Sequence, residues 1–149
     1  MAREDLRRSV LVTSKFCSEL ERVVDEALTE AMVAHEYEVQ EFYYCLPDSE
    51  MIHRYTPDFT FPESPIVIEV KGYWGFDRKE RDKYRLVKKQ HPEIDLRFVF
   101  RDGSIKLHNK TMATYGDWCR KYGFKCADGK IPDEWVLEIV RKQLSACNC

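Results

Sequence analysis

The sequence predicts a single α/β domain over residues 1–149, with a mixed β-sheet flanked by helices. Apolar residues recur at helical spacing between positions 14 and 34, and an apolar run at 66–68 is typical of a buried strand. A charged helical segment at 77–90 separates that run from a second apolar run at 96–100. With 44% hydrophobic and 13% aromatic residues, a chain of 149 residues can bury one sizeable core.

The first predicted element is an amphipathic helix over 14–34. Thr13 or Ser14 can cap it, because a hydroxyl oxygen accepts hydrogen bonds from the first backbone N–H groups. Glu21 lies at the rim of the apolar stripe, close enough to reach an edge of the core, and Cys17 is expected to be a small core residue. Other acids are expected on the solvated face: Glu19, Asp25, Glu26 and Glu30.

Strands are predicted after this helix. Alternating, aromatic-rich residues predict a strand over 37–46, and a turn at 47–50 leads to a second strand over 51–55. The third strand covers 66–71 and the fourth covers 96–100. Residues 104–108 are expected to pair with the fourth strand across the turn at 101–103.

Two short helices are predicted near the C-terminus. Thr114 can cap the first, which ends at Gly123 because glycine readily adopts the left-handed conformation that closes a helix. Pro132 can begin the second, which continues to about residue 140 and leaves 141–149 as a tail. Aromatic residues in both helices recur at helical spacing, so we expect them to pack in the core rather than against nucleic-acid bases.

The helix at 77–90, which ends before His91-Pro92, is rich in positive charge. Two interpretations are open: contacts with DNA phosphates, or a solvated helix with internal ion pairs. Tyr84 and Val87 form its predicted buried side. Its basic residues are Arg78, Lys79, Arg81, Lys83, Arg85, Lys88 and Lys89.

Charge and composition exclude several classes of protein. The net charge is only −2, but residues 1–50 hold 5 basic and 12 acidic side chains, whereas 51–110 hold 13 and 9. No segment is long and apolar enough to span a membrane, and the N-terminus lacks the apolar core of a signal peptide, so a cytoplasmic protein is expected. The six cysteines show neither zinc-ribbon nor redox-motif spacing and are expected to be reduced thiols.

The strongest functional signal lies between Asp58 and Lys71. Pro57 biases the chain before Asp58 towards an extended conformation, and Glu69 and Lys71 end the apolar strand on the same side. If the two segments pair as a bent hairpin, Asp58 lies beside Glu69. Two adjacent carboxylates favour a divalent cation such as Mg²⁺ or Mn²⁺, although an acid and a lysine at a strand end are also common on solvated surfaces.

The order of elements resembles the PD-(D/E)XK nuclease core, and several segments narrow the resemblance to the endonuclease I family of tailed bacteriophages, the Holliday-junction resolvases. The likeness spans about residues 14–136 in matching order. The segments are Phe16-Cys17-Ser18-Glu19-Leu20-Glu21, Tyr55-Thr56-Pro57-Asp58-Phe59, Ile68-Glu69-Val70-Lys71-Gly72-Tyr73-Trp74, the stretch 90–100, and Ile131-Pro132-Asp133-Glu134-Trp135.

The resemblance implies a structure-selective DNA endonuclease that cuts four-way and other branched junctions in the cytoplasm of the phage-infected host. It also implies a homodimer that exchanges N-terminal segments (14–46), while 51–140 forms the nuclease core. Glu21 would then come from one subunit, and Asp58, Glu69 and Lys71 from its partner. Three basic residues would form an N-terminal arm towards DNA, unless that end is a disordered tail: Arg3, Arg7 and Arg8.

The chemistry implied by the resemblance is phosphodiester hydrolysis with two Mg²⁺ ions per site, for which Mn²⁺ substitutes, and without a nucleotide cofactor. Asp58 would bridge the ions, Glu69 and the Val70 carbonyl would hold one, and Glu21 would assist the other. Lys71 would orient the water or stabilise negative charge. Two alternatives are a mismatch-nicking or restriction-type endonuclease on the same core, and a module that binds branched DNA without cutting it.

Overall fold

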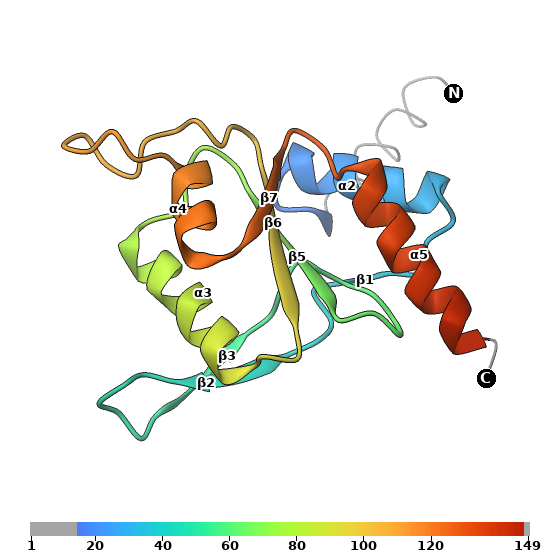
Figure 1. The fold of residues 1–149 in the computed structure, drawn as a ribbon, viewed down its shortest axis with the longest axis horizontal. Helices are drawn as coiled ribbons and strands as arrows, with labels where there is room; N and C mark the ends of the chain where they lie inside the picture. The colour runs from blue at the N-terminus through green and yellow to red at the C-terminus, as the bar shows by residue number, and fades with distance from the viewer. Residues whose placement is uncertain (1–14, 148–149) are drawn as a thin grey trace, which may run out of the picture.

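A computed structural model describes residues 15–147 and confirms the predicted mixed α/β class. Five strands form one sheet in the order β1-β4-β5-β6-β7, and β2 and β3 form a separate hairpin. Figure 1 shows α3 and α4 on one side of the five-stranded sheet and α2 and α5 on the other. The acid-bearing strand β5 is therefore the middle strand of a sheet that helices cover on both faces.

The central strands have the predicted positions. β5 (Ile66–Lys71) pairs antiparallel with β4 (Phe59–Thr60) and parallel with β6 (Asp95–Phe100). β6 in turn pairs parallel with β7 (Lys125–Asp128). Five of the six residues of β5 are buried, as expected where helices cover both faces of a sheet.

One hydrophobic cluster covers each face of the sheet. On one face, Ile66, Ile68 and Val70 of β5 pack in a cluster with Leu20 of α2 and Trp135 of α5. On the other face, Val67 of β5 and Phe98 of β6 pack with aromatic residues that include Tyr84 of α3 and Trp118 of α4. This alternation leaves Glu69 and Lys71 on the α3 side, as the period of two along a strand requires.

Local signals explain where the helices begin and end. Asp77 caps α3 (Arg78–Gln90) by accepting a hydrogen bond from the Glu80 backbone N–H. Thr114 and Asp117 form a reciprocal capping box on α4 (Tyr115–Tyr122), which ends at Gly123 with φ of 76°. These three boundaries match the sequence predictions.

The first helix starts later than predicted. α2 (Glu19–Glu30) is capped by Ser18, whose side chain accepts a hydrogen bond from the Glu21 N–H; Thr13 and Ser14 lie outside the described residues. Cys17 therefore precedes the helix and is exposed, so its predicted place in the core is wrong. α5 (Asp133–Cys147) also differs, because residues 141–147 continue the helix instead of forming a tail.

The predicted strand over 37–46 is two strands in different sheets. β1 (Glu36–Tyr37) pairs with β4, and β2 (Phe42–Cys45) pairs with β3 (Ile52–Tyr55). Glu38 breaks the strand with a left-handed φ of 52°, and its N–H donates to the Asp58 carbonyl at 2.9 Å. The predicted strand at 104–108 is also wrong: only a bridge between Lys106 and Thr114 forms, because β7 occupies the edge of β6.

Gln90, the last residue of α3, fixes the hairpin to the rest of the domain. The Gln90 side-chain amide makes two hydrogen bonds with the Cys45 backbone, and His91 Nε2 contacts the Tyr43 carbonyl at 2.7 Å.

Within the described residues, no helix has the length and apolar character needed to cross a membrane.

Candidate active site

The predicted hairpin brings Asp58 to the end of the central strand. Phe59 pairs with Ile68, so one residue back along the antiparallel register Asp58 lies beside Glu69. The Val70 backbone N–H donates a hydrogen bond of 2.7 Å to Asp58 Oδ2, which fixes the carboxylate. Asp58 and Glu69 are each only 7% exposed, so both acids lie in a region of low dielectric.

Burial and crowding change how these acids titrate. Burial is the main cause that raises the pKa of Asp58 to about 9, and the neighbouring Glu69 and Glu21 carboxylates raise it further against the Val70 hydrogen bond. Burial also raises the pKa of Glu69, although the Lys71 charge and the Tyr55 hydrogen bond oppose it. A positive charge placed beside these acids would therefore lower their pKa and stabilise their ionised forms.

Two tyrosines hold Glu69 in place. The Tyr55 hydroxyl donates to Glu69 Oε2 at 2.7 Å, and the Tyr84 hydroxyl lies 3.2 Å from Glu69 Oε1. Burial and the Glu69 charge raise the pKa of both phenols well above the ordinary value, so they remain donors. The sequence suggested only core packing for Tyr84 and no site role for Tyr55, which stands immediately before Thr56-Pro57-Asp58.

Lys71 lies between two carboxylates. Its Nζ is 3.6 Å from both Glu69 Oε1 and Glu80 Oε2, and its side chain is only 15% exposed. Burial alone would raise the pKa of Glu80, but the hydrogen bond from Lys83 at 2.7 Å and the charges of Lys83 and Lys71 lower it. Glu80 and Lys83 thus extend the site onto α3, a connection that sequence reasoning missed.

Glu21 reaches the same region from α2. It is 5% exposed, its Oε2 has no hydrogen-bond partner within residues 15–147, and its charge contributes to the raised pKa of Asp58. The structure therefore brings together all four predicted catalytic residues, and it does so within one chain. The predicted ligand Val70 lies between Glu69 and Lys71.

Comparison with known proteins identifies the family of the chain. The phage endonuclease I family model matches residues 1–147 of the chain. The chain belongs to the phage endonuclease I family. It is 42% identical to Endonuclease I of Escherichia phage T7 over 123 residues, which cover 83% of this chain and 79% of that protein. It is 41% identical to Endodeoxyribonuclease 1 of Enterobacteria phage T3, covering 83% and 78% of the two chains.

Membership of the family confirms the predicted resemblance, and the names of both relatives denote enzymes that cut nucleic acid within the strand. Of the basic residues predicted to contact DNA, Arg78, Lys79, Arg85, Lys88 and Lys89 are exposed on α3. Arg81 does not share this face, because it is buried and donates to the Phe76 carbonyl at 2.7 Å. Arg3, Arg7 and Arg8 lie outside the described residues.

A hollow of about 660 Å³ lies beside this exposed face of α3, between it and α4. Arg78 and Arg85 of α3 and Lys121 of α4 line it, together with the buried Arg81 and the acids Asp77, Asp82 and Asp117. Arg85 also stacks on Tyr122, with its guanidinium carbon 4.1 Å from the ring centroid. The surface between α3 and α4 therefore offers arginine and lysine side chains to an anionic backbone.

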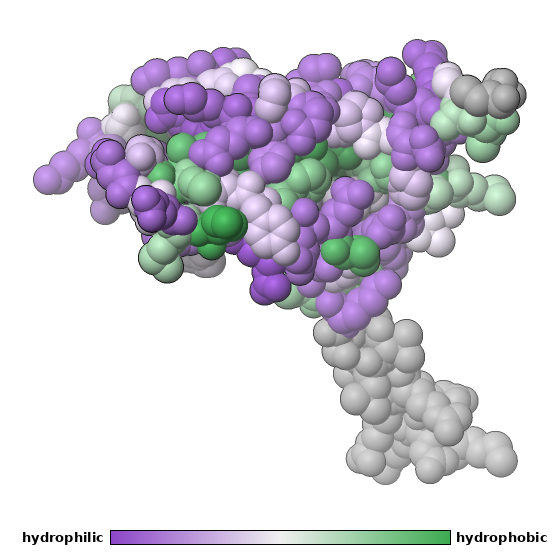
Figure 2. All heavy atoms as spheres, turned by 90° about the horizontal axis from the view of Figure 1, so that it is seen from below, coloured by the Kyte–Doolittle hydropathy of each residue, from purple (hydrophilic) through white to green (hydrophobic). Residues whose placement is uncertain are grey.

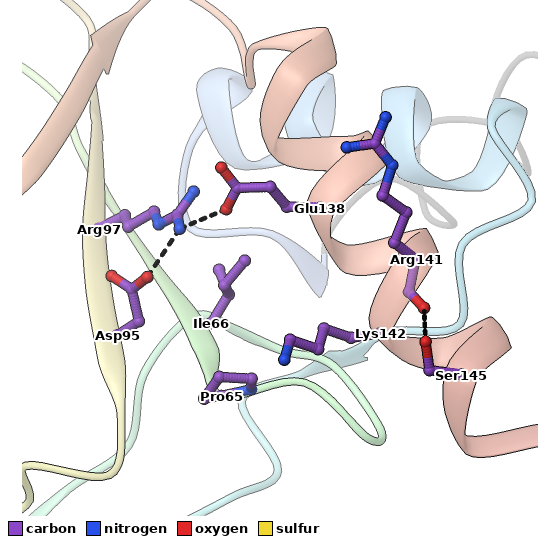
Figure 3. A pocket seen from close by; sticks show the side chains of 8 residues that line it. All are labelled: Pro65, Ile66, Asp95, Arg97, Glu138, Arg141, Lys142 and Ser145. Atoms are coloured by element: carbon purple, nitrogen blue, oxygen red, sulfur yellow. Dashed lines mark hydrogen bonds and ion pairs between the residues drawn. The ribbon is translucent and has the colours of Figure 1, made fainter. Parts of the chain in front are cut away.

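A second hollow, of about 380 Å³, lies where β5 and β6 begin and faces α5 (Figure 3). Arg97, which is 2% exposed, donates from Nη2 to both Asp95 and Glu138, and its guanidinium stacks on Trp135. These two ion pairs join β6 to α5. Because Glu69 and Lys71 lie at the opposite end of β5, this hollow is separate from the candidate active site.

Proposed function

We propose that this member of the phage endonuclease I family is a divalent-metal-dependent endodeoxyribonuclease that resolves four-way and other branched DNA junctions. The observation that carries the proposal is the buried meeting of Asp58, Glu69 and Lys71 at the end of the middle strand. The mixed sheet with this acidic centre also supports assignment to the PD-(D/E)XK nuclease core. The endonuclease names of the relatives point to the same class of reaction.

The donor set fits magnesium. Three buried carboxylates and a backbone carbonyl offer only oxygen atoms, and the raised pKa of Asp58 calls for a nearby cation. One Glu21 oxygen also has no hydrogen-bond partner among residues 15–147. Asp58, Glu69 and the Val70 carbonyl would hold one Mg²⁺, and Asp58 and Glu21 would hold a second. When bound, the cations supply positive charge that polarises the phosphate and lowers the pKa of the attacking water.

The protein residues then have separate tasks. The phenols of Tyr55 and Tyr84 hold Glu69 in one orientation, which leaves the other lone pairs of its carboxylate available. Lys71, held between Glu69 and Glu80, presents its ammonium group to negative charge that develops on the phosphate. Burial excludes water, so each of these charges acts more strongly than on a solvated surface.

Binding is assigned to the exposed basic side of α3. Contacts to phosphates carry no base information, so this face supports selection by the path of the backbone rather than by sequence. Arg78, Lys79 and Arg85 lie on the same helix as Glu80 and Tyr84, which contact the acidic centre. A phosphate backbone that follows α3 is thereby led towards Lys71.

The exchanged homodimer is also part of the proposal: the contacts that the N-terminal segment makes with the nuclease core within one chain would form between two chains. Large apolar side chains are exposed on and beside the β2–β3 hairpin, which connects the segment carrying Glu21 to the nuclease core: Val39, Tyr43, Leu46, Met51 and Ile52. The view from below shows apolar patches within a mostly hydrophilic surface (Figure 2). Covering these side chains with a second chain would remove them from water, and a two-fold dimer would supply paired cuts.

Mixed dimers test the exchange. Glu21→Ala and Asp58→Ala chains are unfolded and refolded together, and cutting is compared with each variant alone. An exchanged dimer regains one complete site in the mixture, because one site receives Glu21 and Asp58 from unaltered segments. If each site forms within a single chain, the mixture stays inactive although size-exclusion chromatography shows dimers.

The function is tested with an end-labelled four-way junction and a linear duplex of matched sequence. We expect cutting of the junction in Mg²⁺, no cutting with chelator, and binding without cutting in Ca²⁺. Lys71→Ala should bind the junction but lose cutting. Equal cutting of the duplex would favour the mismatch-nicking or restriction-type alternative, and tight binding without any cutting would favour a binding module.

A further inference from the structure

A second group of ligand atoms lies beside Glu21. The Cys17 sulfur, a Glu21 carboxylate oxygen and a Glu38 carboxylate oxygen all lie within 4.8 Å of one another. They come from separate places: Cys17 precedes the Ser18 cap of α2, Glu21 lies in the first turn, and Glu38 follows β1. The hydrogen bond from the Glu38 N–H to the Asp58 carbonyl fixes the backbone of Glu38 at this position.

The Glu21 carboxylate, which also faces the candidate active site, shows that a ligand is required at this position. The residue is 5% exposed, and its Oε2 is buried with no hydrogen-bond partner in the part of the chain that the structure describes. A buried carboxylate oxygen without a donor is costly, and a cation would satisfy it. A cation can reach these atoms from solvent, because Cys17 and Glu38 are both exposed.

We propose that Cys17, Glu21 and Glu38 form a binding site for a thiophilic divalent cation of the Zn²⁺ class. One sulfur and two oxygens, with water as the fourth ligand, suit tetrahedral zinc, whereas Mg²⁺ selects oxygen ligands alone. Ligand atoms around zinc lie roughly 3–4 Å apart, so the exposed Cys17 and Glu38 side chains need to move inwards by only about 1 Å. On binding, the thiol loses its proton to solvent and the thiolate sulfur forms the bond to the metal.

Cobalt(II) is the probe for this site, because a cobalt–thiolate bond has charge-transfer absorption that carboxylates do not produce. Reduced protein is titrated in a Cys147→Ser, Cys149→Ser background, which removes the closely spaced C-terminal cysteines. We expect charge-transfer bands from a single cobalt–thiolate bond, whatever cobalt the carboxylates of the active site also bind, and Zn²⁺ should abolish these bands by competition. Cys17→Ser should remove the bands, and Glu38→Gln should weaken affinity by about tenfold or more, as loss of residues at metal sites does.

Cys45→Ser is the matched control, since Cys45 is also exposed but lies on the β2–β3 hairpin. Its titration should equal that of the background protein. Bands that persist in Cys17→Ser, or that disappear in Cys45→Ser, would overturn the proposal. Because the bands report binding without any DNA, the result stands whether or not the protein cuts junctions.

One consequence rests on the proposed nuclease function. Occupancy by zinc engages Glu21, so micromolar Zn²⁺ should inhibit Mg²⁺-dependent cutting, and Cys17→Ser should cut with at least about tenfold weaker inhibition by Zn²⁺. Inhibition that is unchanged in Cys17→Ser would show that zinc acts at Asp58 and Glu69 instead. The cobalt spectra and the inhibition series therefore separate a failure of this site from a failure of the nuclease assignment.

Discussion

Replacing Asp58 with asparagine should stabilise the protein in chelator while abolishing cutting. The pKa of Asp58 is about 9 in the folded protein against an ordinary 3.8, because burial and the Glu69 and Glu21 carboxylates oppose ionisation. The folded state therefore binds more protons than the unfolded state between these two values. Over that range, rising pH lowers stability by up to about 1.4 kcal/mol per pH unit.

The size of the Asp58 pKa shift limits how much stability the carboxyl can cost. At neutral pH the folded protein gives up at most about 4 kcal/mol relative to a neutral side chain, and sharing of the repulsion among three acids reduces this to about 2 kcal/mol. The asparagine oxygen can still accept the Val70 hydrogen bond. We therefore expect the melting temperature of Asp58→Asn in chelator to exceed that of the parent by about 4–8 °C.

Thermal unfolding in chelator between about pH 5 and pH 8 measures this difference. The gap should be smaller at the acidic end and grow as pH rises, because Asp58 of the unfolded chain then ionises while the buried carboxyl of the folded chain keeps its proton. Mg²⁺ should raise the melting temperature of the parent but not of the variant. An Asp58→Asn protein that is no more stable than the parent at about pH 8 would refute the argument that charge repulsion strains this site.

Three further changes test other parts of the structure. Lys79→Gln should weaken binding to all DNA sequences alike and reduce the slope of affinity against salt by about one, measured by fluorescence anisotropy. The Tyr43 carbonyl and Glu93 raise the pKa of His91, so protonated His91 stabilises the fold below about pH 6.5 and this stabilisation is lost as pH rises through the higher folded pKa. His91→Gln should remove this pH dependence, which is under about 1 kcal/mol in urea unfolding. Gly123→Ala should cost about 1 kcal/mol in the same assay, because alanine is strained at φ of 76°.

Local signals made part of the fold predictable. An apolar run marked β5, Thr114 capped α4, and Gly123 ended α4. The short strands β4 and β7 were missed because two to four residues carry too little pattern, and their pairing depends on neighbouring strands. The break at Glu38 gave no sequence signal, since a left-handed glutamate is held there by its hydrogen bond to the Asp58 carbonyl.

Part of the candidate site was also predictable from the sequence. Strand alternation and the Pro57-Asp58 segment were sufficient to place Asp58 beside Glu69 and Lys71. The contact of Glu69 with Tyr84 was not, because it joins residues 15 positions apart through the packing of α3 on the sheet. The grouping of Glu38 with Cys17 likewise depends on how β1 meets the start of α2, which no residue spacing encodes.

The arrangement of charge explains how an acidic chain can bind DNA. Residues 1–50 carry 12 acids and only 5 basic residues, whereas the basic helix α3 lies on the opposite face of the sheet from α2. Charges separated by more than about 10 Å are screened at moderate salt. The electrostatic potential at a phosphate beside α3 therefore comes from the charges of α3 rather than from the net charge of −2. The two acids that contact Lys71, Glu69 and Glu80, are already held by lysines and tyrosines. The proposed function therefore requires an approach from the α3 face, where phosphates meet Lys71 before they meet the acidic N-terminal helix.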